Sequence, residues 1–294
     1  MMARRVEFRI LAGVDGSAQA RAALATLIEG PWPEESLVRA VVARQRRLPH
    51  QRSILLSALD RSADETAERA RRTLADRWPD AEAVVVDKVP AEGILAEAAR
   101  FRADLIVVGW RGYGAARRLL MGSVSRGVVR GAHCAVLVVR RRPEPVRHIA
   151  IGFDGSDNAK RAVSLVARLS PEGDGRVSLI GVAELLVPTS RAPRVGGIRG
   201  SVNRALERLN TERSRAAMTG LHRAAQELTR AGWRTRTELR SGEPLRELVD
   251  GVSKSRAHLL VIGARGTNGA RQLLLGSVAE GVLNRSPVPV LLAR

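Results

Sequence analysis

Short apolar runs alternate with amphipathic segments along this chain of 294 residues, and the same order occurs twice. Runs of aliphatic residues such as 104–108 and 258–262 are typical of buried parallel strands. Segments 64–78 and 91–102 place apolar residues at helical spacing, which predicts surface helices packed on a sheet. Each half therefore predicts the same α/β fold: a doubly wound, five-stranded parallel sheet with helices on both faces, repeated in tandem.

Length and composition predict where the two halves meet. A chain of this length fits two domains, and residues 140–147 are charged and carry two prolines, so few contacts are expected to cross there. The predicted domains are residues 1–142 and 143–294. The second half is longer by about 15 residues, which fall near 187–201, before a predicted helix over 202–231. We interpret these extra residues as a surface loop, with a lid over a ligand site as the alternative.

A glycine-rich pattern follows one apolar run in each half. Both copies read Gly-x2-Gly-x9-Gly-Ser, and their members are Gly109, Gly112, Gly122 and Ser123, then Gly263, Gly266, Gly276 and Ser277. Each copy links the carboxyl end of a predicted strand to a predicted helix, which is where open parallel sheets bind ligands. The glycines allow close backbone approach, and the serines could cap the helix or donate to a phosphate. The duplication favours a phosphate-binding loop over a mere helix cap.

A second repeated feature opens each half, where an apolar strand ends in Asp-Gly-Ser. Asp15 precedes a predicted helix over 18–29, and Asp154 precedes one over 158–169. Such an aspartate can cap the following helix, or it can orient a metal-bound water or a ribose hydroxyl. Because each opening strand is expected beside the strand that carries the glycine loop, we interpret both aspartates as site residues.

These features resemble universal stress protein domains, and the chain as a whole resembles a tandem universal stress protein. The likeness covers the opening strand with its aspartate, the glycine loop, and valine-rich closing strands at 135–139 and 287–292. The resemblance implies a Rossmann-like fold of the adenine nucleotide alpha hydrolase type. It also implies that the closing strands pair, so that the two halves form a pseudo-dimer. The glycine loop marks the ATP-binding branch of that family, which implies ATP, with Mg²⁺, in each half.

The resemblance also implies which residues contact each nucleotide. The triphosphates would lie on the glycine loops and the residues that follow them, Val124, Ser125 and Val278. The aspartates would lie near ribose and phosphates, with backbone groups of Gly13, Val14, Gly152 and Phe153. Adenine would meet backbone groups at the end of the second strand, for which the candidates are Val42 and Val182. The chain departs from the family pattern at Ala279, where the first half has Ser125, and at Tyr113-Gly114, where the second half has Thr267-Asn268.

The chain is strongly basic, with 49 lysines and arginines against 30 acids and a net charge of +19. Such a balance raises the question of nucleic acid or acidic partners. The arginines are spread along the sequence, however, and no aromatic residues are interleaved with them, so we interpret the charge as a solvated surface and do not expect nucleic acid to be the partner. Arg117, Arg118 and Arg271 lie inside the glycine loops and could attract a polyphosphate, although a helix surface explains them equally well.

Other chemistry has little support in the sequence. Cys134 is the single cysteine, so no internal disulfide forms and a reducing, cytoplasmic location is expected. The five histidines lack metal-ligand spacing, and there is no Walker A sequence or nucleophile elbow. No apolar run approaches membrane length, and the first predicted strand begins too early to leave room for a signal peptide.

Three classes of function remain, and we favour the first. It is a nucleotide-binding regulatory protein in which ATP holds one conformation that a partner protein recognises. The second is a slow ATPase that uses Asp15 and Asp154, although no residue stands out as a general base. The third is a basic protein that binds nucleic acid or acidic partners. Cyclic AMP in place of ATP, filling of only one site, and a further homodimer all stay open at this point.

Overall fold

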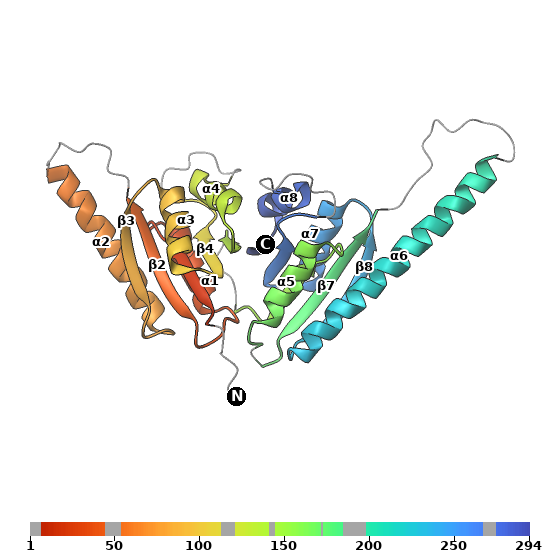
Figure 1. Ribbon diagram of the computed structural model, residues 1–294, viewed down its shortest axis with the longest axis horizontal. Helices are drawn as coiled ribbons and strands as arrows, with labels where there is room; N and C mark the ends of the chain where they lie inside the picture. The colour runs from red at the N-terminus through yellow and green to blue at the C-terminus, as the bar shows by residue number, and fades with distance from the viewer. Residues whose placement is uncertain are drawn as a thin grey trace.

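The computed structural model describes residues 7–44, 54–112, 121–140, 145–171, 173–184, 198–266 and 275–294, which form one layered α/β body (Figure 1). The first half contains β1 (Arg9–Gly13), α1 (Ala18–Ile28), β2 (Leu37–Arg44), α2 (Ile54–Ala75), β3 (Glu82–Asp87), α3 (Pro90–Phe101), β4 (Leu105–Gly109), α4 (Ser123–Gly131) and β5 (Ala135–Val139). The second contains β6 (His148–Gly152), α5 (Asp157–Ala167), β7 (Arg176–Ala183), α6 (Ile198–Arg230), β8 (Arg234–Ser241), α7 (Pro244–Ser255), β9 (Leu259–Gly263), α8 (Ser277–Arg285) and β10 (Val290–Ala293).

The strands form a single ten-stranded sheet in the order β3-β2-β1-β4-β5-β10-β9-β6-β7-β8. Within each half all pairs are parallel and the chain winds outward from the first strand in both directions, as predicted for a doubly wound fold. The two closing strands, β5 and β10, pair antiparallel, with Leu137 opposite Leu291. The halves are therefore related as the two members of a dimer would be, which confirms the implied pseudo-dimer.

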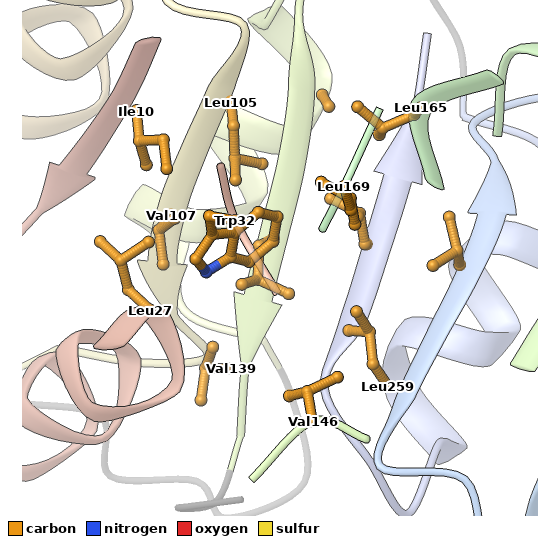
Figure 2. Close-up of a cluster of buried hydrophobic side chains, with 14 of the residues drawn as sticks. Ile10, Leu27, Trp32, Leu105, Val107, Val139, Val146, Leu165, Leu169 and Leu259 are labelled. Carbon is orange, nitrogen blue, oxygen red and sulfur yellow. The ribbon is translucent and has the colours of Figure 1, made fainter. Parts of the chain in front are cut away.

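Four helices cover each face of the sheet, and the strands supply both cores by alternation. On one face α1, α2, α5 and α6 pack on residues such as Ile10 and Leu105; on the other, α3, α4, α7 and α8 pack on residues such as Leu11 and Ile106. Figure 2 shows Trp32 and Val139 of the first half in one cluster with Leu169 of the second. The expectation that few contacts cross between the halves is therefore wrong. The closing strands β5 and β10 are apolar, and each hydrophobic core contains residues of both halves.

The long helices differ most from the predicted boundaries. Helix α2 begins at Ile54, earlier than the predicted residue 64, and ends before Trp78, which is buried beyond the helix. Helix α6 begins at Ile198 and matches the predicted 202–231 closely at its end. Of the predicted surface loop, residues 187–197 lie outside the described residues. Figure 1 shows α6 running well past the ends of β7 and β8.

Candidate functional site

The predicted site residues lie at the carboxyl edge of the sheet, at the point where the chain changes direction. Strand β1 pairs with β4, with Gly13 opposite Val108, and the chain continues to opposite sides of this pair. Asp15 therefore follows β1 next to the glycine loop that follows β4. The second half repeats this arrangement, with Gly152 opposite Ile262. Such a switch point is where doubly wound sheets bind ligands.

The Asp-Gly-Ser segments form the same tight turn in both halves. The carboxylate Oδ1 of Asp154 accepts the backbone N–H of Ser156 at 3.0 Å, and the equivalent distance from Asp15 to Ser17 is 2.9 Å. Gly155 between them has a φ of 79°, a conformation that suits glycine. The helix cap is the serine, because the hydroxyl oxygens of Ser17 and Ser156 accept N–H groups of the first turns of α1 and α5.

The second oxygen of each aspartate faces a glycine of the repeated loop. A Cβ atom placed on Gly112 would collide with Oδ2 of Asp15, and one on Gly266 would lie 2.7 Å from Oδ2 of Asp154. Glycine at these two positions is what allows the loop to approach the carboxylate. The structure thus brings together the two features that the sequence repeats, 97 residues apart in the first half and 112 in the second.

Helices α4 and α8 begin without a side-chain cap. The N-cap residues are Gly122 and Gly276, so Ser123 and Ser277 are the first helical residues, and of the two roles offered for these serines the helix cap does not hold. The N–H of Gly122 donates to the carbonyl of Trp110 at 3.0 Å, which closes the base of the loop, and Gly276 does the same with Ala264. Both serines are exposed. The amides of the first turn find no acceptor among the described residues, as is usual where a helix start is uncapped.

Ser125 has a structural role that the sequence did not predict. Its side chain is buried, and its hydroxyl donates to the carbonyl of Gly109 at 2.6 Å, which ties the first turn of α4 to the end of β4. Ala279 occupies the same place in α8 and is buried without any hydroxyl. The two halves therefore differ in how firmly this helix is anchored to its strand. The predicted contact between Ser125 and a phosphate stays a prediction.

Four of the predicted site glycines are explained by packing. A Cβ atom on Gly109 would lie 2.9 Å from the backbone of Gln19 in α1, and one on Gly263 would lie 2.7 Å from Cβ of Asn158 in α5. A Cβ atom on Gly13 would lie 2.8 Å from the side chain of Ile94, and one on Gly152 would lie 2.9 Å from that of Ile262. Glycine at these positions lets helices and core side chains come close to the strand ends, which shapes the edge whether or not a ligand contacts them.

The backbone positions predicted for ribose and adenine are partly engaged in the sheet. The N–H of Val14 donates to Val41 at 3.0 Å, and that of Phe153 donates to Ile180 at 2.9 Å, so these two amides are not available to a ligand. By this register, the position equivalent to Val42 is that of residue 181, one residue before Val182. The two adenine candidates are therefore not equivalent, which is a one-residue error in matching the halves. The half-buried Val124 and Val278, by contrast, occupy matching places in the first turns of α4 and α8.

Two arginines that the sequence analysis missed connect the halves near these helices. Arg140, after β5, donates from Nη1 to the carbonyl of Asn284 in α8 at 2.9 Å, and Arg294, after β10, donates to the carbonyl of Val129 in α4. Burial lowers the pKa of Arg294. Aligning the two halves of the sequence could have revealed this pair, because an arginine follows each closing strand. A cavity of about 120 Å³ lies between α4 and α8, lined by Arg126 and Glu280 among others.

Comparison with known proteins agrees with this arrangement. The model of the universal stress protein family matches residues 8–140 and, a second time, residues 145–294. The chain belongs to the universal stress protein family. It contains two such domains in tandem, and the predicted boundary at residue 142 falls in the gap between the two matches.

This tandem universal stress protein has relatives of the same length and of half its length. A universal stress protein of Mycolicibacterium smegmatis is 26% identical over 314 aligned positions, covering 100% of this chain and 99% of the relative. The universal stress protein YxiE of Bacillus subtilis is 26% identical over 144 residues, covering 49% of this chain and 96% of the relative. A universal stress protein structure from Archaeoglobus fulgidus has a TM-score of 0.64 at 18% identity and covers 97% of this chain and 98% of its own, which shows a shared fold.

Other candidate chemistry in this universal stress protein is sparse among the described residues. They contain no cluster of three or more histidine, cysteine or acidic side chains arranged to hold a metal, and no helix long and apolar enough to cross a membrane. Burial raises the pKa of the Cys134 thiol to about 11, so this thiol is protonated at neutral pH. A shallow hollow of about 500 Å³ lies away from the site, between β3 and α3. The predicted residues Tyr113, Gly114, Arg117, Arg118, Thr267, Asn268 and Arg271 lie outside the described residues.

Proposed function

We propose that this protein binds two molecules of ATP with Mg²⁺, one at the carboxyl edge of each domain, and acts as a nucleotide-dependent regulator in a cytoplasmic stress response. The observation that supports it is the duplicated meeting of an aspartate, a glycine and an uncapped helix start. Asp15 faces Gly112 beside the start of α4, and Asp154 faces Gly266 beside the start of α8. First-turn amides that have no acceptor in the described part of the chain, together with the helix dipole, favour phosphates at both places.

The residues present fit a magnesium-bound triphosphate. Mg²⁺ usually takes one or two protein carboxylates together with phosphate oxygens and water, and each site offers one aspartate close to the glycine loop. Bound Mg²⁺ would offset the negative charge of the phosphates. The exposed hydroxyls of Ser123 and Ser277 stand at the starts of α4 and α8, where they can donate to phosphate oxygens.

A regulatory role is favoured over catalysis by the surroundings of the aspartates. Oδ1 of Asp15 and of Asp154 already accepts a backbone N–H within its own turn, which fixes the orientation of the carboxylate. ATP would instead bridge the aspartate turn and the start of α4 or α8, and so order the loop between them. The arginines that cross between the halves would carry such a change from one domain to the other.

Isothermal titration of Mg²⁺–ATP into nucleotide-stripped protein tests the proposal, and we expect two equivalents per chain. A Cβ atom on Gly122 would lie 3.2 Å from Cα of Arg111, so a larger side chain there fills the space next to the loop. The backbone of Gly122 lies in the extended region, which valine adopts readily, so the fold should survive. Gly122→Val should therefore leave one equivalent, Gly276→Val should leave the other, and the double variant should bind none.

Each single variant is the matched control for the other, since the untouched site should keep its affinity. Circular dichroism and thermal melting should show that all three variants fold. Retention of two equivalents in the double variant would contradict the site assignment, and no binding to the folded native protein would contradict the proposal. Release of phosphate at a rate that falls in Asp15→Asn or Asp154→Asn would favour an ATPase.

A further inference from the structure

Helix α6 carries a row of arginines on its solvent face. Arg208, Arg215, Arg223 and Arg230 recur every seven or eight residues, which is about two helical turns, so they lie along one side of the helix. All four side chains are exposed. The opposite side carries Leu221, Ala224 and Leu228, which are buried against the sheet. We call these four residues the α6 arginine row.

The arginines of the row form no ion pair with any residue in the described part of the chain, and α2 provides the contrast. Helix α2 holds the same place in the first half and carries four arginines and four acids. There Arg71 and Arg72 both pair with Glu68 at 2.8 Å, and Arg69 pairs with Glu65 at 3.5 Å. Helix α6 carries seven arginines against three glutamates. Its positive charge is therefore not balanced locally, and it lies on one exposed face.

The residues between the arginines indicate what kind of surface this is. Thr219, His222 and Gln226 are exposed and polar, and the acid on this face is Glu212. At the margin, Glu227 accepts a hydrogen bond from Ser164 at 2.9 Å. An interfacial membrane helix needs an apolar outward face, whereas the exposed large apolar side chains of α6, Val202 and Leu209, lie to one side of the row. Single-stranded nucleic acid needs stacking aromatics, and α6 contains none.

We propose that the α6 arginine row binds the phosphate backbone of double-stranded DNA. The row is rigid and straight, and it extends about 33 Å from Arg208 to Arg230, close to one turn of the double helix. Four unpaired guanidinium groups on a polar face can donate to phosphate oxygens and offer no means of reading bases. Binding is therefore independent of DNA sequence and strongly dependent on salt. The row is built from α6 alone and does not depend on the nucleotide sites.

Fluorescence anisotropy of a labelled 20-base-pair DNA duplex tests the proposal, measured with the full-length protein over a series of salt concentrations. Four phosphate contacts predict a slope of about −3.6 for the logarithm of the binding constant against the logarithm of salt concentration. The triple variant Arg208→Gln/Arg215→Gln/Arg223→Gln should reduce the size of that slope by about 2.7 and weaken binding at least tenfold at low salt. These residues are exposed, so the fold should be unaffected.

The matched control is Arg69→Gln/Arg71→Gln/Arg72→Gln in α2, which removes the same charge from arginines that are already paired. It should change DNA affinity less than twofold. Equal weakening by both triple variants would overturn the proposal, because it would show a response to net charge alone. Absence of duplex binding at low salt would overturn it as well, as would binding to phosphatidylserine vesicles but not to the duplex. ATP titration of the α6 variant should still give the native stoichiometry, so either proposal can fail without the other.

Discussion

At the residue scale, the carboxylate of Asp154 has two separable roles. Oδ1 accepts the N–H of Ser156 at 3.0 Å and so holds the turn that leads into α5. Oδ2 points at Gly266, on the side where the proposed nucleotide would lie. The first role needs only an oxygen acceptor, whereas the second needs a negative charge for Mg²⁺. A substitution that keeps the oxygen and removes the charge distinguishes them.

Asp154→Asn should leave the melting temperature nearly unchanged, because the amide oxygen still accepts the Ser156 N–H. Its affinity for Mg²⁺–ATP at the second site should fall at least tenfold, since a bond to a charged group contributes about 1.5–3 kcal/mol. Isothermal titration and thermal melting measure the two effects on the same sample. Asp174→Asn, an exposed acid of the same domain that pairs with Arg234, should alter neither. Native affinity in Asp154→Asn would count against a magnesium role for this residue.

At the scale of elements, a buried ion pair connects the sheet to a helix in the first domain. Arg39 of β2 donates to Glu97 of α3 at 2.7 Å, and Glu97 is only 4% exposed. The guanidinium group of Arg39 also lies 4.3 Å from the ring centre of Phe101. Arg100 bonds the other oxygen of Glu97 at 2.9 Å but is 69% exposed. One buried carboxylate thus has a half-buried and an exposed partner.

Arg39→Met should lower the free energy of unfolding by roughly 2 kcal/mol, because it leaves a buried carboxylate with a single partner and uncovers Phe101. Arg100→Met removes the exposed partner and should cost less than about 1 kcal/mol. Chemical denaturation at neutral pH measures both values. Equal losses of unfolding free energy in the two variants would mean that the lower exposure of Arg39 adds nothing to the strength of its ion pair with Glu97.

Most of these elements could be predicted from the sequence, because apolar runs and turn residues are local signals. The strands at 104–108 and 258–262 were located within one residue, and the helices that follow Asp-Gly-Ser within two. The sequence left a helix cap open as one role of Ser123 and Ser277, because the preceding glycines, which take the N-cap conformation, give no side-chain signal there. The role of Ser125 could not be foreseen, since its partner is a backbone carbonyl 16 residues away.

The spatial distribution of charge is a feature that the sequence does not show directly. Along the chain the arginines are scattered, and on that basis a solvated surface was the natural interpretation. In the structure, three of the four arginines of α2 pair with acids of the same helix, while α6 carries four of its own on one face. The difference arises from residue spacing over a 33-residue helix, whose length and orientation are known only once the helix is placed on the sheet.

At the scale of the whole molecule, the sheet and both cores run through the junction between domains. Leu137 of β5 and Leu291 of β10 lie opposite each other and are fully buried. At this edge, each domain therefore completes its core only through contact with the other domain. Two domains that share an apolar junction are expected to unfold together, since opening one would expose the closing strand of the other.

Differential scanning calorimetry should show one transition, with equal calorimetric and van't Hoff enthalpies. Leu137→Ala should shift that single transition down by roughly 5 °C or more, because removing a buried leucine side chain costs about 2–5 kcal/mol. Leu209→Ala, which truncates a side chain that is 46% exposed on α6, should leave the transition in place. Two resolved transitions, of which Leu137→Ala lowers the temperature of only one, would show that the domains unfold independently.

The antiparallel pairing of β5 with β10 has a consequence for how the two domains can change over time. Because one chain carries both partners, their association is intramolecular, with an effective concentration that dilution in the cell does not alter. The pair never dissociates into subunits that could recombine with other copies, so each domain always meets the same neighbour. A substitution in one domain therefore changes only one side of the junction. In an assembly of identical chains, the same substitution would change both sides. Ser125 at the position equivalent to Ala279, and Arg126 at the position equivalent to Glu280, are differences of the kind that such a permanent partnership permits.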